Sequence, residues 1–140
     1  MKMIKVVAAL IEKDGKYLIA RRADGDSDVL GKWEFPGGKV EENEDEMHAI
    51  KREIKQEFEI DIKPIRFITN NVFKYPSKIV DLRLYECRYL SGEFKLHNHY
   101  EYKFVSKDEI KNYNLCDADK LFISYLNNWH FTNKLIKYRC

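Results

Sequence analysis

The sequence predicts an α+β fold, an α/β/α sandwich around a mixed β-sheet. Strand-like segments, one long helix-like segment, further strands and a final helix follow one another, and no internal repeat or linker separates them. The chain has 140 residues, 44% of them apolar and 14% aromatic, which is typical of one globular domain with one core. We therefore expect a single domain over residues 1–140, and we leave the structure of the tail, residues 129–140, open.

The strands are expected where β-branched and aromatic residues run together or alternate with polar ones. These segments are residues 3–11, 16–20, 33–35, 65–73, 79–88 and 101–105. The turn signal Asp14-Gly15 follows the first segment and residues 75–77 follow the fourth, so each predicts a hairpin. The polar segment 21–32 is expected to be a loop, and Pro36-Gly37-Gly38 is expected to break regular structure.

Two helices and a shorter one are expected. The first covers residues 43/44–58, with Asn43 as its N-cap. Its apolar residues recur at helical spacing and form one stripe, which consists of Met47, Ile50, Ile54 and Phe58. Ser106 and Glu109 resemble a capping box that opens the short helix, and residues 117–128 form the last helix.

Charge and composition limit the function classes. The net charge of +2 arises from 25 basic and 23 acidic residues, so charge predicts no general affinity for nucleic acid polymers. The apolar runs are too short for a membrane span, and the N-terminal run lacks a secretion cleavage site. Cys87, Cys116 and Cys140 are odd in number and far apart, which fits reduced thiols. We expect a cytoplasmic protein, either a monomer or a homodimer.

The first helix concentrates acidic residues on one face. Glu53, Gln56 and Glu57 are spaced i, i+3 and i+4, so their side chains share a face, and two carboxylates there can hold one hard cation. Ala49 lies one turn earlier and is expected to leave room for a ligand. From these carboxylates alone, a solvated charged face is an equal alternative. The adjacent Gly37-Gly38 lets the backbone approach a ligand and frees a carbonyl to face a cation.

The spacing of these residues resembles the Nudix box. Five residues separate Gly38 from Glu44, and seven more separate Glu44 from Arg52-Glu53. Gln56 stands where the family usually has a glutamate, and Glu59 stands where a glycine normally ends the helix. Residues 30–41 and the pair at 21–22 resemble the MutT-like branch, which includes CTP and oxidised-nucleotide pyrophosphohydrolases. The resemblance implies a Nudix-type sandwich and Mg²⁺ as cofactor, with Mn²⁺ as an alternative.

The resemblance also implies metal ligands. Gly37 would supply a carbonyl oxygen, Glu53 and Glu57 carboxylates, and Gln56 a weak, uncharged oxygen. Many relatives carry a further acid where this chain has Asn98, which cannot act as a base.

Catalytic roles follow from the same positions. Glu53 is the expected base or metal-bridging residue. Arg52 is expected to pair with Glu44 and so to fix the helix against the loop. Glu101 could substitute for the acid that Asn98 lacks.

Substrate contacts are implied around the nucleotide. Arg22 is expected on the α-phosphate because a guanidinium matches phosphate oxygens in a bidentate manner, although a surface cation is an equal alternative. Phe35 and Tyr75, with the apolar edges of Ile4 and Val6, are expected to enclose the base, although such aromatics are more often core residues.

Asp119 is expected to read the edge of the base. An ionised carboxylate only accepts hydrogen bonds, so it favours the amino group of cytosine or a purine with N–H donors. The alternative is that Asp119 merely caps the last helix. His97 and His99 share a strand face, but two histidines are weak evidence for a metal site, and we expect surface or core roles for both.

The leading functional hypothesis is Mg²⁺-dependent hydrolysis of a (d)NTP to a (d)NMP and pyrophosphate, with cytidine or oxidised purine nucleotides as substrates. A catalytically weakened Nudix domain that acts as a nucleotide-binding or regulatory module is the second hypothesis, motivated by Gln56 and Asn98. A nucleoside diphosphate-X hydrolase is the third.

Overall fold

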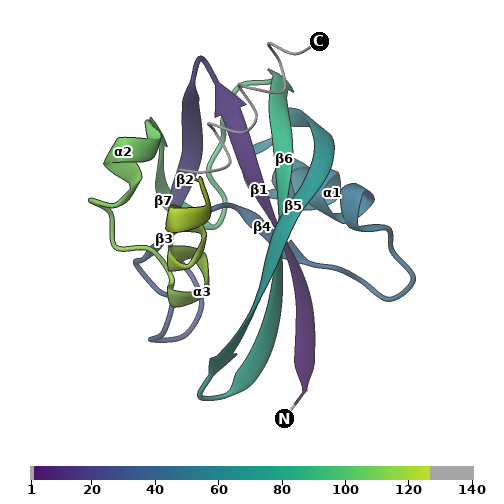
Figure 1. The fold of residues 1–140 in the computed structure, drawn as a ribbon. Helices are drawn as coiled ribbons and strands as arrows, with labels where there is room; N and C mark the ends of the chain where they lie inside the picture. Colours follow the sequence, from purple (N-terminus) through teal and green to yellow (C-terminus); the bar gives the residue numbers. More distant parts are fainter. Residues whose placement is uncertain (1, 127–140) are drawn as a thin grey trace.

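The computed structural model describes residues 2–126, which form a mixed β-sheet with helices on both faces (Figure 1). The strands are β1 Met3–Lys13, β2 Lys16–Arg22, β3 Trp33–Glu34, β4 Gly37–Lys39, β5 Asp61–Tyr75, β6 Lys78–Ser91 and β7 His99–Val105. The helices are α1 Glu46–Phe58, α2 Lys107–Ile110 and α3 Asp117–Lys120. The predicted α+β fold is confirmed.

Strand β1 lies at the centre of the sheet. On one edge it runs parallel to β6 from Met3 to Glu12, and β6 forms a long antiparallel hairpin with β5. On its other edge it pairs first with β4, from Val6 to Ala8, and then with β2 at Glu12 and Lys13. The sheet therefore forks along β1, with β4 on one branch and β2, β3 and β7 on the other.

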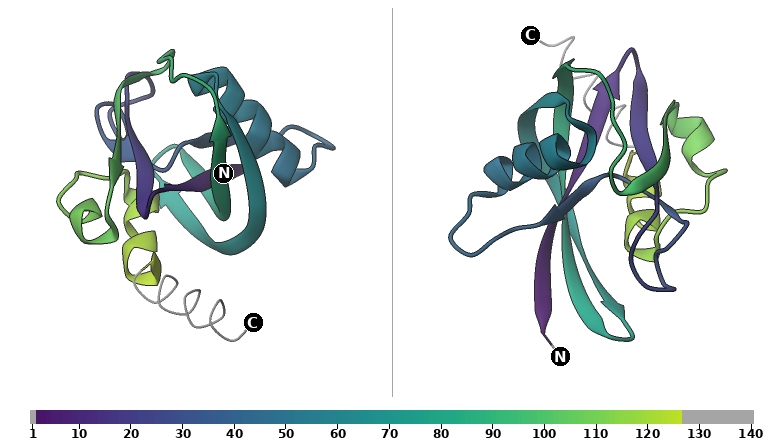
Figure 2. Two further views of the ribbon diagram at one scale, coloured as in Figure 1. Left: turned by 90° about the horizontal axis from the view of Figure 1, so that it is seen from above. Right: turned by 180° about the vertical axis from the view of Figure 1, so that it is seen from behind.

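Two clusters of buried apolar side chains lie on opposite faces of the sheet. Helix α1 packs on one face through Ile50, Ile54 and Phe58, whereas α3 contributes Ala118 to the cluster on the other face. Successive β1 side chains alternate between the two clusters because strand side chains point to opposite faces. Both views of Figure 2 place α1 and α3 on opposite sides of the central strands, as the predicted sandwich requires.

Helix α1 differs from its prediction at its start and in its stripe. Asp45 is the N-cap and accepts hydrogen bonds from the amides of Met47 and His48. The predicted N-cap, Asn43, is wrong because this residue lies in the preceding turn with a φ of 62°. Met47 is 37% exposed, so its place in the buried stripe is also wrong. Ala49 is fully buried in the core beneath α1 and lines neither of the cavities at the site, so the predicted ligand space does not lie at this residue.

The end of α1 contains a residue in the left-handed region. Glu59 is the C-cap, with a φ of 59°, and its amide donates to the carbonyl of Lys55. A glycine is the usual residue in this conformation because it has no Cβ atom. Glu59 therefore carries some backbone strain, as expected for a glutamate at a position where a glycine normally ends the helix.

Other boundaries also differ. Gly37–Lys39 forms β4 instead of breaking regular structure, because its backbone pairs with β1. The predicted last helix is interrupted: α3 ends at Lys120, Leu121 is a turn, and residues 122–126 are again helical. Residues 127 and 128 lie outside the described part of the chain. The predicted capping box of Ser106 is confirmed.

The remaining predictions concern composition and the tail. No helix within residues 2–126 is long and apolar enough to cross a membrane. Cys87 and Cys116 are buried free thiols, whereas Cys140 and the tail, residues 129–140, lie outside the described residues. The single domain and the oligomeric state stay predictions.

Candidate active site

A cavity of about 320 Å³ opens at the fork of the sheet, beside α1. Gly37 from β4, Glu53 and Glu57 from α1, and Arg22 from the end of β2 all line it. Gln56 is not part of this lining, and its side-chain oxygen accepts a hydrogen bond from Arg52 instead. The fold thus brings together the predicted carboxylates of Glu53 and Glu57, the glycine strand β4 and the predicted phosphate-binding cation Arg22.

The close approach of α1 to β4 explains the two glycines. A Cβ atom on Gly38 would lie 2.8 Å from Cγ of Glu53 and closer still to its carboxylate, whereas real Cβ contacts essentially never fall under 3.0 Å. A Cβ atom on Gly37 would lie 2.8 Å from the carbonyl carbon of Val7 in β1. Gly38 therefore makes room for the Glu53 carboxylate, and Gly37 allows β4 to pair with β1.

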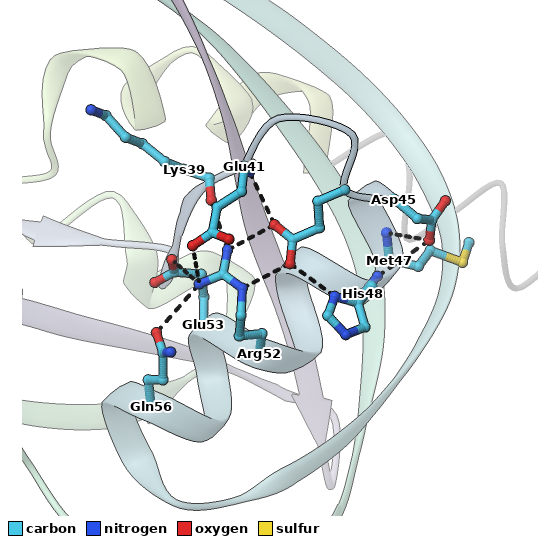
Figure 3. A network of polar contacts seen from close by, with 9 residues as sticks. Lys39, Glu41, Asp45, Met47, His48, Arg52, Glu53 and Gln56 are labelled. Atoms are coloured by element: carbon cyan, nitrogen blue, oxygen red, sulfur yellow. Dashed lines mark hydrogen bonds and ion pairs between the residues drawn. The ribbon is translucent and has the colours of Figure 1, made fainter.

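Arg52 ties α1 to the preceding loop (Figure 3). Its Nε and Nη2 donate to the carboxylate of Glu44 at 2.7 and 2.9 Å, so the predicted pair is present. Nη2 also donates to the carbonyl of Lys39 at 3.0 Å, and Nη1 donates to Glu53 at 2.8 Å. The hydrogen bonds from Arg52 hold the pKa of Glu44 far below its usual range. One guanidinium thus fixes the loop, the end of β4 and the Glu53 carboxylate together.

Glu57 is a buried carboxyl group in an acidic surrounding. The residue is only 8% exposed, and its Oε2 has no hydrogen-bond partner among the described residues. Burial, followed by the charges of Glu34 and Glu53, raises the pKa of Glu57 to about 9, and the charge of Arg22 lowers it only in part. A cation beside Glu57 would remove this repulsion and supply the missing partner.

Arg22 is already paired within the cavity. Its Nη1 donates to Glu34 and its Nη2 to Asp24, each at 3.1 Å. Burial lowers the pKa of Arg22, but Glu34 and Asp24 outweigh burial and raise it above its ordinary value. The guanidinium therefore stays charged, as a phosphate contact requires.

Glu34 and His99 are site residues that the sequence interpretation did not identify. Nε2 of His99 lies 2.8 Å from Oε2 of Glu34 and 3.9 Å from Oε2 of Glu57. The imidazole is 7% exposed and stacks on Phe58, at 5.1 Å between ring centroids. The contact arises from the pairing of β7 with β2, which sets His99 opposite Arg22 and has no local signal in the sequence.

The cavity carries donors that fit a divalent cation. Glu34, Glu57 and His99 each offer one donor atom, and these atoms lie within 4.8 Å of one another. Glu53 adds a further carboxylate to the lining. The unpartnered oxygen of Glu57 is the observation that fits such an ion.

A smaller cavity of about 100 Å³ adjoins the first and shares Arg22 with it. Tyr75 and Asp119 line this second cavity. The hydroxyl oxygen of Tyr75 accepts a hydrogen bond from the amide of Ala118 at 3.2 Å. Phe35 lines neither cavity and is buried in the core. Its position therefore agrees with the alternative that this aromatic residue is a core residue and does not contact the base.

Asp119 is 5% exposed, and its Oδ1 accepts a hydrogen bond from the amide of Phe35 at 3.1 Å. Burial, followed by the charge of Glu34, raises the pKa of Asp119 well above its usual range. Burial therefore works against the ionised form expected from the sequence, and a neutral acid would donate as well as accept. The helix-cap alternative is wrong, because the N-cap of α3 is Cys116.

The remaining candidates divide between cavity and surface. Asn98, Ile4 and Val6 line the larger cavity. Glu101 does not, and its carboxylate accepts from Arg21 at 3.0 Å. Glu101 is therefore not placed to substitute for the missing acid at position 98.

Comparison with known proteins agrees with this geometry. The chain matches the NUDIX domain family over residues 6–125 and therefore belongs to the Nudix family of hydrolases.

Two curated proteins and one solved structure are similar to this chain over most of its length. CTP pyrophosphohydrolase of Escherichia coli strain K12 is 37% identical over 119 residues, which cover 85% of this chain and 87% of the relative. An 8-oxo-dGTP diphosphatase of Buchnera aphidicola subsp. Schizaphis graminum is 34% identical over 131 residues, which cover 94% and 98%. The crystal structure of a MutT protein from Methanosarcina mazei Go1 superposes with a TM-score of 0.82 at 28% identity, covering 91% of this chain and 95% of that one.

Proposed function

We propose that this chain is a Mg²⁺-dependent nucleoside triphosphate pyrophosphohydrolase, which converts a (d)NTP and water to the (d)NMP and pyrophosphate. The observation that carries the proposal is one cavity that combines Glu53, Glu57, the glycine strand β4 and Arg22. Cytidine or oxidised purine nucleotides are the inferred substrates, since similar proteins are named for CTP and 8-oxo-dGTP. Mn²⁺ is the alternative ion.

The reaction needs a water molecule to attack phosphorus, a P–O bond to the pyrophosphate leaving group to break, and a base to accept the water proton. A divalent ion, when bound, neutralises charge on the phosphate oxygens and lowers the pKa of a bound water. Glu53 is the proposed base, because its carboxylate faces the cavity and Arg52 fixes its orientation at 2.8 Å. Arg22 binds the α-phosphate by exchanging its pairing with Glu34 or Asp24 for phosphate oxygens.

A catalytically weakened domain is the second candidate. This candidate is suggested by the uncharged residues Gln56 and Asn98, which stand where the family usually has acids. Only Asn98 lines the cavity. Gln56 contacts Arg52 outside the lining, so the charge that it lacks is not one that would line the cavity. This placement favours the enzyme. A nucleoside diphosphate-X hydrolase ranks third, because no residue of the described chain favours it specifically.

A nucleotide panel with Mg²⁺ tests the proposal. Release of pyrophosphate from CTP, dCTP, 8-oxo-dGTP or another triphosphate, and its loss when the ion is chelated, is the expected result. Tight nucleotide binding without turnover at high enzyme concentration would support the weakened domain. Release of a nucleoside monophosphate from diphosphate sugars, with no pyrophosphate from triphosphates, would support the third candidate.

A further inference from the structure

Arg22 has to give up an internal partner before it can bind a phosphate, and its two partners differ in burial. The side chain of Asp24 is 55% exposed, so water can replace Arg22 there, whereas the side chain of Glu34 is only 13% exposed. A buried carboxylate that loses its hydrogen bonds costs free energy. The release of Arg22 to a substrate therefore depends on what else holds Glu34.

His99 holds the other oxygen of Glu34. Nη1 of Arg22 donates to Oε1 of Glu34 at 3.1 Å, and Nε2 of His99 lies 2.8 Å from Oε2, so the two partners occupy different oxygens. We propose that His99 is a positioning residue, which keeps Glu34 hydrogen-bonded and in place when Arg22 moves to the α-phosphate of the nucleotide. The proposal rests on the proposed function, since it gives Arg22 the same phosphate contact.

The geometry makes Nε2 of His99 the donor to Glu34. Glu34 is ion-paired with Arg22, and an ionised carboxylate only accepts hydrogen bonds, so Nε2 carries the proton. Oε2 of Glu57 lies 3.9 Å from the same nitrogen, too far for a hydrogen bond. Nδ1 is buried and has no hydrogen-bond partner in the part of the chain that the structure describes. Nε2 is therefore the polar atom through which the ring is held.

The surroundings of His99 suit a fixed partner. Its side chain is 2% exposed, and its ring stacks on Phe58 at 5.1 Å between centroids. Strand β7 pairs with β2 and sets His99 opposite Arg22, so one strand pair carries both partners of Glu34. A ring packed in this way has little freedom to follow Arg22 when that longer side chain moves. The competing explanation is that His99 only fills the core against Phe58.

Arg22 has a donor that its internal partners leave unused. Its Nε is buried and has no hydrogen-bond partner among residues 2–126. A phosphate offers several acceptor oxygens and can engage a guanidinium in a bidentate manner. Movement of Arg22 onto a phosphate therefore gains hydrogen bonds, while His99 limits what is lost at Glu34.

The variants His99→Asn and His99→Gln test the proposal as a matched pair. The amide nitrogen of glutamine can take the place of Nε2 and still donate to Glu34, whereas the shorter asparagine cannot reach that place. The probe is the α,β-methylene analogue of CTP with Mg²⁺, and the measurement is its dissociation constant. We expect a rise of about tenfold or more in His99→Asn, because Arg22 then leaves a buried carboxylate unpaired, and of less than about threefold in His99→Gln. Equal affinity in His99→Asn and wild type would overturn the proposal.

An Arg22→Ala background separates positioning from packing. In this background Glu34 loses no partner when the analogue binds, so adding His99→Asn should not weaken binding further. If His99 only packs against Phe58, His99→Asn weakens binding by the same factor in both backgrounds, and that result would refute the positioning role.

A measurement on the wild-type protein needs no variant to fold. With ¹⁵N-histidine labelling, Nε2 of His99 should carry its proton both before and after the analogue is added. Loss of that proton on binding would contradict the proposal. Because none of these experiments uses turnover, a protein that binds the analogue with the expected ranking of variants but releases no pyrophosphate from any triphosphate would refute the proposed function alone.

Discussion

The variants Gly38→Ala and Gly37→Ala distinguish the positioning of Glu53 in the cavity from the stability of the fold. In Gly38→Ala, the new Cβ lies 2.8 Å from Cγ of Glu53, so Cγ must move by at least 0.6 Å to reach an ordinary contact of 3.4 Å. The carboxylate is closer and must move further, by about 1 Å, a displacement that costs about 100-fold in rate. This loss corresponds to about 2.7 kcal/mol of transition-state stabilisation.

The two glycines differ in what a methyl group would strike. Gly38→Ala meets the flexible side chain of Glu53, whereas Gly37→Ala meets the main chain of Val7 and Ala8, which cannot move without breaking the β1–β4 pairing. Pyrophosphate release and thermal unfolding are measured on both variants. We expect Gly38→Ala to melt near the wild-type temperature with low activity, and Gly37→Ala to lose stability and activity together. Full activity in Gly38→Ala would refute the argument that β4 positions Glu53.

Three further predictions concern single side chains. Glu53→Gln should lower kcat by about two orders of magnitude or more, as expected for loss of a base or charge-stabilising group. The control Glu93→Gln, at an exposed position, should not lower kcat. Near-full activity in Glu53→Gln would show that the base is assigned wrongly. Asp119→Asn should change the ranking of kcat/KM across the nucleotide panel while pyrophosphate remains the product, because Asp119 lines the smaller cavity; an unchanged ranking would make Asp119 a purely structural contact to Phe35. Burial raises the pKa of Glu46, but hydrogen bonds from Arg83 and Tyr85 outweigh it and lower the pKa below its unfolded value. Glu46 therefore stabilises the fold above the unfolded pKa, and this is lost as the pH falls through the lower folded pKa. Denaturant unfolding of Glu46→Gln should show a loss of about 1 kcal/mol at pH 7 that disappears in acid; a loss independent of pH would contradict the charge-based explanation.

The residues predicted correctly in space are those governed by local periodicity and by the family spacing. Glu53 and Glu57 share a face because one helical turn separates them, and Arg52 reaches Glu44 because the helix and its loop are adjacent in sequence. Met47 was misplaced because Met47 and Ala49 lie at opposite edges of the apolar stripe of α1, and only packing against the sheet selects which edge is buried.

Glu34 and His99 could not be joined from the sequence, because 65 positions separate them. Their contact depends on how β7 and β3 pair with β2, and strand register over such distances leaves no local signal. Asp119 was found by resemblance, but its protonation depends on burial, which a sequence does not show.

The fork at β1 also governs when the cavity can exist during folding. Met3 at the start of β1 pairs with Ile79 in β6, and the cavity lining extends from Ile4 to His99. During synthesis, the chain must therefore emerge past His99 before the cavity can close, and every truncated fragment ending earlier lacks a wall of it. An ion bound there is linked to the completed fold as a whole, so the thermal midpoint should rise with ion concentration.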